Sequence, residues 1–183
     1  ILLVEDSVRF YSTYLPELYK LVLKQSSEFL KETLNEQQRK FRKRSRPKIL
    51  LATNLDDALN MYSKYKHNLL GVISDVGFTV HKDDSPEMEK LDAGIELVRH
   101  IKADNEKMPI LLQSSQDSIS SVAQELGVGF LRKYSKTLML QLADFIKEEF
   151  GFGDFVFRDA DHVEYGRAAN LKELEAMVRE VPD

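Results

Sequence analysis

The chain has 183 residues, 43% of them hydrophobic, and a net charge of −4. This composition excludes a disordered chain and fits one globular domain with a small appendage, while the slight acidity disfavours nucleic acid as a partner. The sequence has no cysteine and no apolar run of roughly 20 residues, which excludes disulfides, thiolate metal sites and membrane spans, so we expect a cytoplasmic protein.

The first predicted elements are a strand over residues 1–4 and an unusually long helix over residues 8–45. The strand is an apolar run at the very start of the chain, so we expect residues upstream of it. Ser7 is the expected N-cap of the helix, and Pro16 either kinks the helix or marks its first turn. A helix this long extends beyond a small sheet, so its second half must protrude or find a partner. Its basic end is either a solvated helix terminus or a contact for an acidic domain or nucleic acid.

Strands and helices continue to alternate along the rest of the chain. Asn54 is the expected cap of the second helix, and a long, polar, irregular loop over residues 76–92 follows the third strand. Five strands alternating with five helices predict an α/β doubly wound parallel sheet over residues 1–150. Residues 151–183 are predicted to form a β-hairpin plus a helix, as an appendage or as a linker to a downstream domain. The remaining expected strands are 48–53, 69–75, 110–112 and 129–133, the helices are 54–62, 94–103, 117–126, 137–150 and 171–181, and the hairpin strands are 155–158 and 163–165.

Polar side chains stand at the carboxyl ends of four predicted strands, namely Glu5, Asp6, Asp75, Ser114 and Lys133. Loops leaving the carboxyl ends of parallel strands form the ligand site of open α/β sheets, so these side chains should meet. Three carboxylates in one pocket raise one another's pKa or bind a cation, and oxygen ligands without His or Cys suit Mg²⁺. A metal, a carboxylate, a hydroxyl and a lysine together suit the handling of a phosphoryl group.

Residues 1–150 resemble the receiver domain of bacterial two-component response regulators. This resemblance implies a flavodoxin-like sheet with strand order 2-1-3-4-5 and a signalling phosphoprotein, capable at most of phosphorylating and dephosphorylating itself, in place of a dedicated enzyme. The five motifs that carry it, in the family's order, are residues 3–7 (LVEDS), 72–75 (VISD), 94–97 (GIEL), 109–115 (PILLQSS) and 129–133 (GFLRK).

The same resemblance implies roles for individual residues. Asp75 matches the phospho-acceptor, and Glu5 and Asp6 match acids that hold Mg²⁺ together with Asp75 and the backbone carbonyl of Gly77. No other cofactor is implied.

The remaining matched positions concern the phosphoryl group and its readout. Ser114 and Lys133 match residues that bind the phosphoryl oxygens, and Phe130 matches an aromatic switch that turns inward when the hydroxyl moves. The implied partners are a histidine kinase or phosphotransfer protein and a fused or downstream output domain.

Three departures from the family pattern stand out. Gly94 lies 19 residues after Asp75, so the loop between them carries an insertion. Tyr134 follows Lys133 where the family usually has a proline in a cis peptide. The first helix is far longer than usual, and its apolar stripe predicts either a homodimeric coiled coil or packing on the tail. The helix and tail also resemble a receiver segment of larger proteins related to phosphoenolpyruvate synthase and pyruvate phosphate dikinase, which implies an output domain downstream of residue 183.

Other interpretations stay open at this point. Asp75 also fits a strand-end carboxylate that caps a helix, and Phe130 also fits a plain core position. A pseudo-receiver that serves as a scaffold without switching is favoured by the inserted loop and the missing proline, and is opposed by the intact acids and lysine. A phosphate or nucleotide enzyme of another class is disfavoured, because the sequence has neither a P-loop nor a dinucleotide-binding glycine motif. The four histidines show no metal-ligand spacing.

Overall fold

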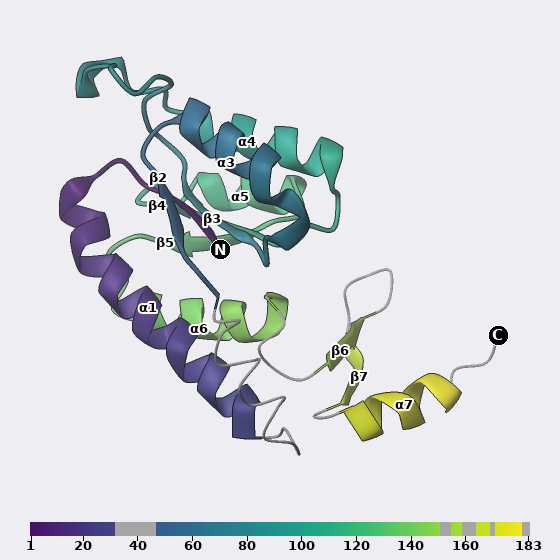
Figure 1. The fold of residues 1–183 in the computed structure, drawn as a ribbon. Coiled ribbons are helices and arrows are strands. Elements are labelled where there is room, and N and C mark those ends of the chain that lie inside the picture. Colours follow the sequence, from purple (N-terminus) through teal and green to yellow (C-terminus); the bar gives the residue numbers. More distant parts are fainter. Residues whose placement is uncertain (32–46, 151–154, 159–163, 169–170, 181–183) are drawn as a thin grey trace.

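The computed structural model describes residues 1–31, 47–150, 155–158, 164–168 and 171–180 (Figure 1). Its main feature is a five-stranded parallel sheet in the order β2-β1-β3-β4-β5, which confirms the predicted doubly wound fold. The strand order reverses between β1 and β3, so the crevice for a ligand is expected at their carboxyl ends. The strands are β1 (Leu2–Val4), β2 (Leu50–Ala52), β3 (Val72–Asp75), β4 (Ile110–Ser114) and β5 (Gly129–Arg132).

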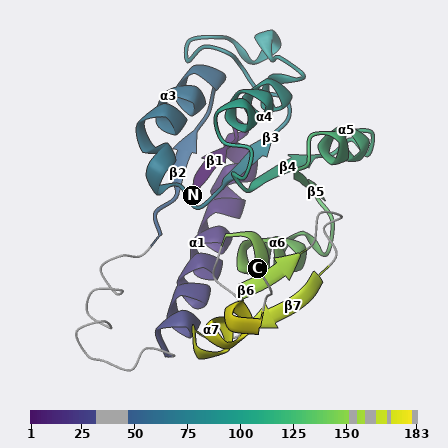
Figure 2. The same cartoon turned by 90° about the vertical axis from the view of Figure 1, so that its right-hand side faces the viewer.

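Helices cover both faces of this sheet, as Figures 1 and 2 show. Helices α1 (Val8–Lys31) and α6 (Leu138–Glu149) pack on one face. Helices α3 (Leu55–Tyr65), α4 (Ala93–Asp104) and α5 (Ile119–Glu125) pack on the other. Two single 3₁₀ turns, η1 (Lys66–Asn68) and η2 (Pro86–Met88), precede and follow β3. None of the helices in the described part of the chain has the length and hydrophobicity of a membrane span.

The strands are apolar without alternation because both of their faces are buried. In β1, Leu2 and Val4 face the layer of α3, α4 and α5, whereas Leu3 faces α1 and α6. All three side chains are at most 1% exposed, and full burial of each stabilises the fold by roughly 1.5–3 kcal/mol. The sheet is therefore a buried platform whose polar groups are confined to its edges and ends.

Two predicted helix caps are confirmed. The Asn54 side chain accepts a hydrogen bond of 2.8 Å from the Asp57 amide at the start of α3, and the Ser7 hydroxyl accepts one of 3.3 Å from the Phe10 amide in α1. Pro16 lies inside α1, so the interpretation that it marks the first turn is wrong. The predicted continuation of this helix to residue 45, including its basic end, lies outside the described residues.

The tail contains the predicted hairpin and helix. Strand β6 (Phe155–Arg158) pairs antiparallel with β7 (Glu164–Ala168), and α7 (Leu171–Glu180) follows. Arg167 of β7 lies 3.9 Å from the Glu148 carboxylate of α6, which brings the hairpin to the end of that helix. The division of the chain into a domain of residues 1–150 and an appendage stays a prediction.

The loop between β3 and α4 is more ordered than predicted. Phe78 and Lys90 form an antiparallel bridge with backbone hydrogen bonds of 3.2 and 3.0 Å. The first two amides of α3 donate to the carbonyls of Thr79 and Val80, and Phe78 is fully buried. The predicted long loop is therefore present, and its two ends are held by backbone hydrogen bonds to each other and to α3.

Candidate functional site

Three carboxylates meet at the carboxyl ends of β1 and β3. Glu5 and Asp6 directly follow β1, and Asp75 is the last residue of β3. The two strands are neighbours, with Val4 paired to Ser74, so their ends lie side by side. One carboxylate oxygen from each acid lies within 4.8 Å of the others. The predicted convergence of these three acids is thus present in the structure.

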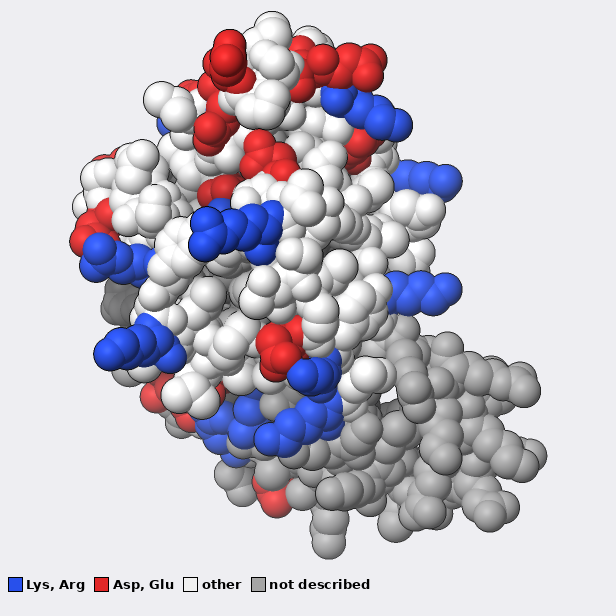
Figure 3. Space-filling view, turned by 90° about the vertical axis from the view of Figure 1, so that its left-hand side faces the viewer, with Lys and Arg blue, Asp and Glu red and all other residues white. Residues whose placement is uncertain are grey.

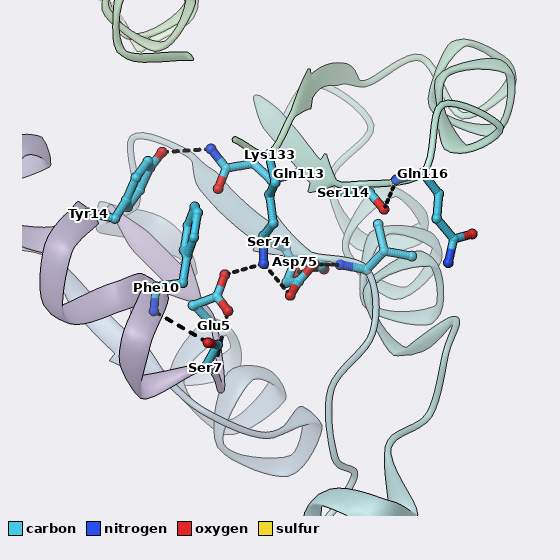
Figure 4. A network of polar contacts seen from close by, with 11 residues as sticks. Glu5, Ser7, Phe10, Tyr14, Ser74, Asp75, Gln113, Ser114, Gln116 and Lys133 are labelled. Carbon is cyan, nitrogen blue, oxygen red and sulfur yellow. Dashed lines mark hydrogen bonds and ion pairs between the residues drawn. The ribbon is translucent and has the colours of Figure 1, made fainter. Parts of the chain in front are cut away.

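Lys133 connects two of these acids from the end of β5. Its Nζ lies 2.6 Å from Oε2 of Glu5 and 2.5 Å from Oδ2 of Asp75 (Figure 4). Glu5 is only 1% exposed and Lys133 only 8%, so the ion pair is largely shielded from water. The ammonium also lies 4.4 Å from the centre of the Phe10 ring, a distance at which the ring attracts a cation.

The pocket carries more negative charge than Lys133 neutralises. Burial and the charge of Asp75 raise the pKa of Glu5 to about 7, in spite of the bond to Lys133. Burial and the charges of Asp75 and Glu89 also raise the pKa of Asp6. Burial alone would lower the pKa of Lys133, but the neighbouring carboxylates raise it. All three shifts have one consequence: the site favours an additional positive charge, whether a proton or a metal cation.

Ser114 ends β4 and faces the same space. Its hydroxyl oxygen accepts a hydrogen bond of 3.1 Å from the Gln116 amide, which leaves the hydroxyl proton available for another acceptor. The Lys133 amide donates to the Ser114 carbonyl over 2.9 Å, which joins the ends of β4 and β5. Ser114 and Lys133 therefore come from neighbouring strand ends and line the same pocket as Asp6 and Asp75.

The chain turns sharply after Lys133. Tyr134 has a φ of 64°, the left-handed conformation that side chains other than glycine rarely adopt, and 77% of the residue is exposed. All peptide bonds in the described part of the chain are trans. The turn after Lys133 is thus made by a left-handed tyrosine without a cis peptide bond, and the tyrosine ring contacts Phe10 edge to face.

These groups surround a pocket of about 330 Å³. A water molecule occupies about 30 Å³ in the liquid, so the space holds a phosphoryl group and several waters. Glu5 lies beneath the pocket, bound to Lys133. The lining residues that also belong to the predicted site are Asp6, Asp75, Gly77, Ser114 and Lys133.

Gly94 holds α4 against the end of β3. Its amide donates to the Val76 carbonyl over 2.8 Å, and a side-chain Cβ at this position would lie 2.1 Å from the Asp75 carbonyl oxygen. Only glycine allows such a close approach of two backbone segments. This contact fixes the loop that begins at Asp75.

Phe130, unlike the predicted acids, Ser114 and Lys133, has no contact with the other predicted site residues among the interactions of the site. It lies in β5, half-buried against the apolar cluster under α3, α4 and α5, and is not among the residues that line the pocket. A core position and a switch position both remain compatible with this placement.

Other residues at the site were not predicted from the sequence. Glu89 lines the pocket from the inserted loop. On the opposite side, Gln113 donates a buried hydrogen bond of 2.7 Å to the Tyr14 hydroxyl, and the Tyr14 ring stacks on Phe10. No sequence signal predicted that Phe10 and Tyr14 lie next to Lys133.

The acidic cluster fits a hard divalent cation. All of its donor atoms are oxygens, and burial together with the charge of Asp75 raises the pKa of Glu5. Mg²⁺ prefers a few carboxylate ligands and keeps several waters, for which the pocket has room. The residues present therefore pass the chemical test for such a site.

Comparison with known proteins assigns the fold. The receiver domain of NtrX from Brucella abortus matches with a TM-score of 0.50 at 17% identity, over 78% of this chain and 93% of that chain. A response regulator receiver domain protein from Clostridium thermocellum matches with a TM-score of 0.48 at 18% identity, over 78% and 87%. The chemotaxis protein CheY4 of Vibrio cholerae matches with a TM-score of 0.48 at 18% identity, over 77% and 91%.

The NtrX match and the strand order show that this chain has the receiver-domain fold. No protein-family model and no curated protein matches the chain. The comparisons give no support to the resemblance to proteins related to phosphoenolpyruvate synthase.

Proposed function

We propose that this chain is a receiver domain of two-component signal transduction that accepts a phosphoryl group on Asp75. One observation carries the proposal: the Asp75 carboxylate lies 2.5 Å from the Lys133 ammonium, in the same pocket as Asp6 and Ser114. A carboxylate flanked by an ammonium, a hydroxyl and further acids is suited to acting as the nucleophile of phosphoryl transfer.

In the proposed reaction, an Asp75 carboxylate oxygen attacks the phosphorus atom of the donor. The new oxygen–phosphorus bond forms while the bond from phosphorus to the donor breaks, and the leaving group takes its electron pair. Lys133 keeps its proton because its pKa is raised, so it supplies a positive charge to the phosphoryl oxygens. Ser114 donates its hydroxyl proton, since its oxygen already accepts from the Gln116 amide.

The metal in this proposal is Mg²⁺, held by the carboxylates of Glu5, Asp6 and Asp75 and by the Gly77 carbonyl. When bound, it neutralises charge on the phosphoryl oxygens. Glu5 contributes a charge only when it is ionised, and its raised pKa links cation binding to loss of a proton.

The proposed donor is a histidine kinase or phosphotransfer protein, and the proposed recipient of the signal is a fused or downstream output domain. The receiver fold supports this class of partner in general terms. Ser114 and Phe130 are the proposed readout residues, and a homodimer through the first helix stays a further prediction that sedimentation of the chain tests.

Incubation with acetyl phosphate and Mg²⁺ tests the proposal by intact-mass spectrometry. We expect the mass to increase by one phosphoryl group in the wild type and to stay unchanged in Asp75→Asn. Hydroxylamine should remove the added group, because it cleaves an acyl phosphate and leaves a serine phosphate intact. Asp56→Asn is the matched control, since Asp56 is an exposed aspartate on α3 that does not line the pocket.

An unchanged mass of the wild-type protein would contradict the proposal. The alternative, a pseudo-receiver that acts as a scaffold, would then be favoured, because the fold would persist without the chemistry.

A further inference from the structure

The loop between β3 and α4 is held in place at the edge of the acidic pocket. The backbone bridge between Phe78 and Lys90 closes the loop, and the Lys90 ammonium forms an ion pair with Glu96 of α4. Glu89 directly precedes the bridging residue, so its backbone position is set by these contacts. The loop is acidic, with five Asp or Glu and two Lys between residues 81 and 92, and Figure 3 shows acidic side chains gathered around it.

The Glu89 carboxylate is directed over Gly77 and into the pocket. Glu89 lines the pocket together with Asp6 and Asp75. A Cβ built on Gly77 would lie 2.3 Å from Oε1 of Glu89, so the carboxylate occupies the space that a side chain at Gly77 would take. The lack of a side chain at Gly77 is therefore a condition for the position of Glu89.

Glu89 acts on the acids of the pocket through its charge. It contributes to the raised pKa of Asp6, and its oxygens do not belong to the group of three carboxylates that lie within 4.8 Å of one another. Among the described residues that line the pocket, Lys133 is the sole Lys or Arg. A further carboxylate at the rim thus favours the binding of a cation in the pocket and disfavours the binding of an anion.

We propose that Glu89 is a fourth carboxylate of this site, which strengthens the binding of a hydrated divalent cation from the rim of the pocket. The inference rests on the proposed function, because it concerns the same metal site. Glu89 is exposed and outside the central group, so its contribution is electrostatic and is screened by salt. An exposed charge interaction of this kind changes an affinity on the order of fivefold.

Isothermal titration calorimetry of the whole chain with MgCl₂ measures this contribution. We expect Glu89→Gln to weaken Mg²⁺ binding about fivefold at low salt and less at high salt. Glu87→Gln is the matched control: it removes the same charge from the same loop at an exposed position that does not line the pocket, and should leave the affinity unchanged.

Gly77→Ala supplies a second, independent variant. Its methyl group would displace the Glu89 carboxylate, so we expect a similar loss of Mg²⁺ affinity, and no additional loss in the double variant with Glu89→Gln. Glu89 is exposed, and the nearest backbone atom to a Cβ at Gly77 would be 3.7 Å away, so an unchanged urea unfolding midpoint is expected and would show that the fold is kept.

The inference would be overturned by a wild-type Mg²⁺ affinity in Glu89→Gln or by an equal loss of affinity in Glu87→Gln. It would also be overturned if the double variant lost as much binding free energy as Gly77→Ala and Glu89→Gln together. Tighter Mg²⁺ binding in Glu89→Gln would also overturn it, since Glu89 would then obstruct the site. If the wild type binds Mg²⁺ and accepts a phosphoryl group, and Glu89→Gln does both equally well, the inference about Glu89 is refuted and the proposed function stands. A wild-type chain that binds no Mg²⁺ refutes the inference and the metal site of the proposed function together.

Discussion

At the scale of single residues, Glu5 is a buried carboxylate that shares its cationic partner with a second carboxylate. It is 1% exposed, and its bonding partners are the Lys133 ammonium at 2.6 Å and the Ser7 amide at 3.2 Å. Asp75 shares the same ammonium, so two carboxylates compete for one positive charge. Buried charges stabilise a fold only when they are fully paired, and this arrangement instead keeps the pocket receptive to a cation.

The pKa of Glu5 predicts how stability depends on pH. Its native pKa is about 7, above the roughly 4.3 of an unfolded glutamate, so the native state holds the proton to higher pH. The contribution of Glu5 to the free energy of unfolding is therefore present below about pH 4.3 and is lost as the pH rises through 7. The loss amounts to about 3–4 kcal/mol, because each unit of pKa difference between the two states is worth about 1.4 kcal/mol.

Urea unfolding without divalent cations, at about pH 5 and about pH 7.5, measures this contribution. Glu5→Gln should have a smaller decrease in stability between the two values than the wild type. Glu125→Gln, at an exposed position of α5, should follow the wild type. Equal pH dependences for wild type and Glu5→Gln would show that Glu5 does not titrate in this range.

At the scale of elements, the site depends on how closely α4 approaches β3. The helix begins where the backbone of Gly94 contacts Asp75 and Val76, with no room for a methyl group between them. The loop from Asp75 onward, including Gly77 and Glu89, starts from this contact. A change in the contact therefore alters stability and the geometry of the acids together.

Gly94→Ala should destabilise the protein by about 2 kcal/mol or more, because a Cβ would lie 2.1 Å from one backbone atom and 2.9 Å from another. Gly127→Ala is an informative comparison, since Gly127 has a φ of 63° but no neighbour within 4 Å of a Cβ. Only conformational strain of about 1 kcal/mol is expected there. Thermal unfolding of both variants checks the order. A Gly94→Ala protein as stable as the wild type would contradict the close contact.

Rules about strand ends predict part of the site and not the rest. Asp6, Asp75 and Lys133 were placed together because the carboxyl ends of neighbouring parallel strands meet at one edge. Glu89 follows no such rule: its position depends on the path of a loop whose polar residues have no periodicity. The two β-branched residues Thr79 and Val80 are a sequence signal for extended backbone in this loop, but two residues are too few to predict a strand.

The turn after Lys133 shows a second limit. The absence of proline predicted a different local turn, but the left-handed backbone of Tyr134 does not follow from its residue type, since tyrosine rarely adopts it. The contact of Phe10 with Lys133 likewise depends on the tilt of α1 against the sheet. Tertiary packing determines such features. A single sequence predicts which helices and strands form better than it predicts the angles at which they pack.

At the scale of the whole molecule, the two buried apolar clusters lie on the two faces of the sheet. Among the described residues, their members run from Ile1 to Phe150. Phe150 closes the second layer, where its ring occupies the space beside Gly71.

Removal of residues 151–183 should therefore leave a cooperatively folded protein with an unfolding temperature within a few degrees of the full chain. The shortened protein should also keep the Mg²⁺ affinity of the full chain, since none of the described tail residues lines the pocket. Differential scanning calorimetry and titration with MgCl₂ check both expectations. An unfolded product would mean that the tail is an integral part of the domain.

Helix α1 contacts Lys133 near its first turn and is long, so a small tilt at that contact produces a large displacement at its other end. Phe10, under the ammonium, and Tyr14, bound to Gln113, anchor the start of a helix whose described part has 24 residues. Such a helix is about 36 Å long, so a tilt of about 5° at its anchored end displaces its far end by about 3 Å. If a phosphoryl group on Asp75, as proposed above, displaced the Lys133 ammonium and the Phe10 ring beside it, a tilt of this size would move the end of α1 farthest from the pocket by that distance.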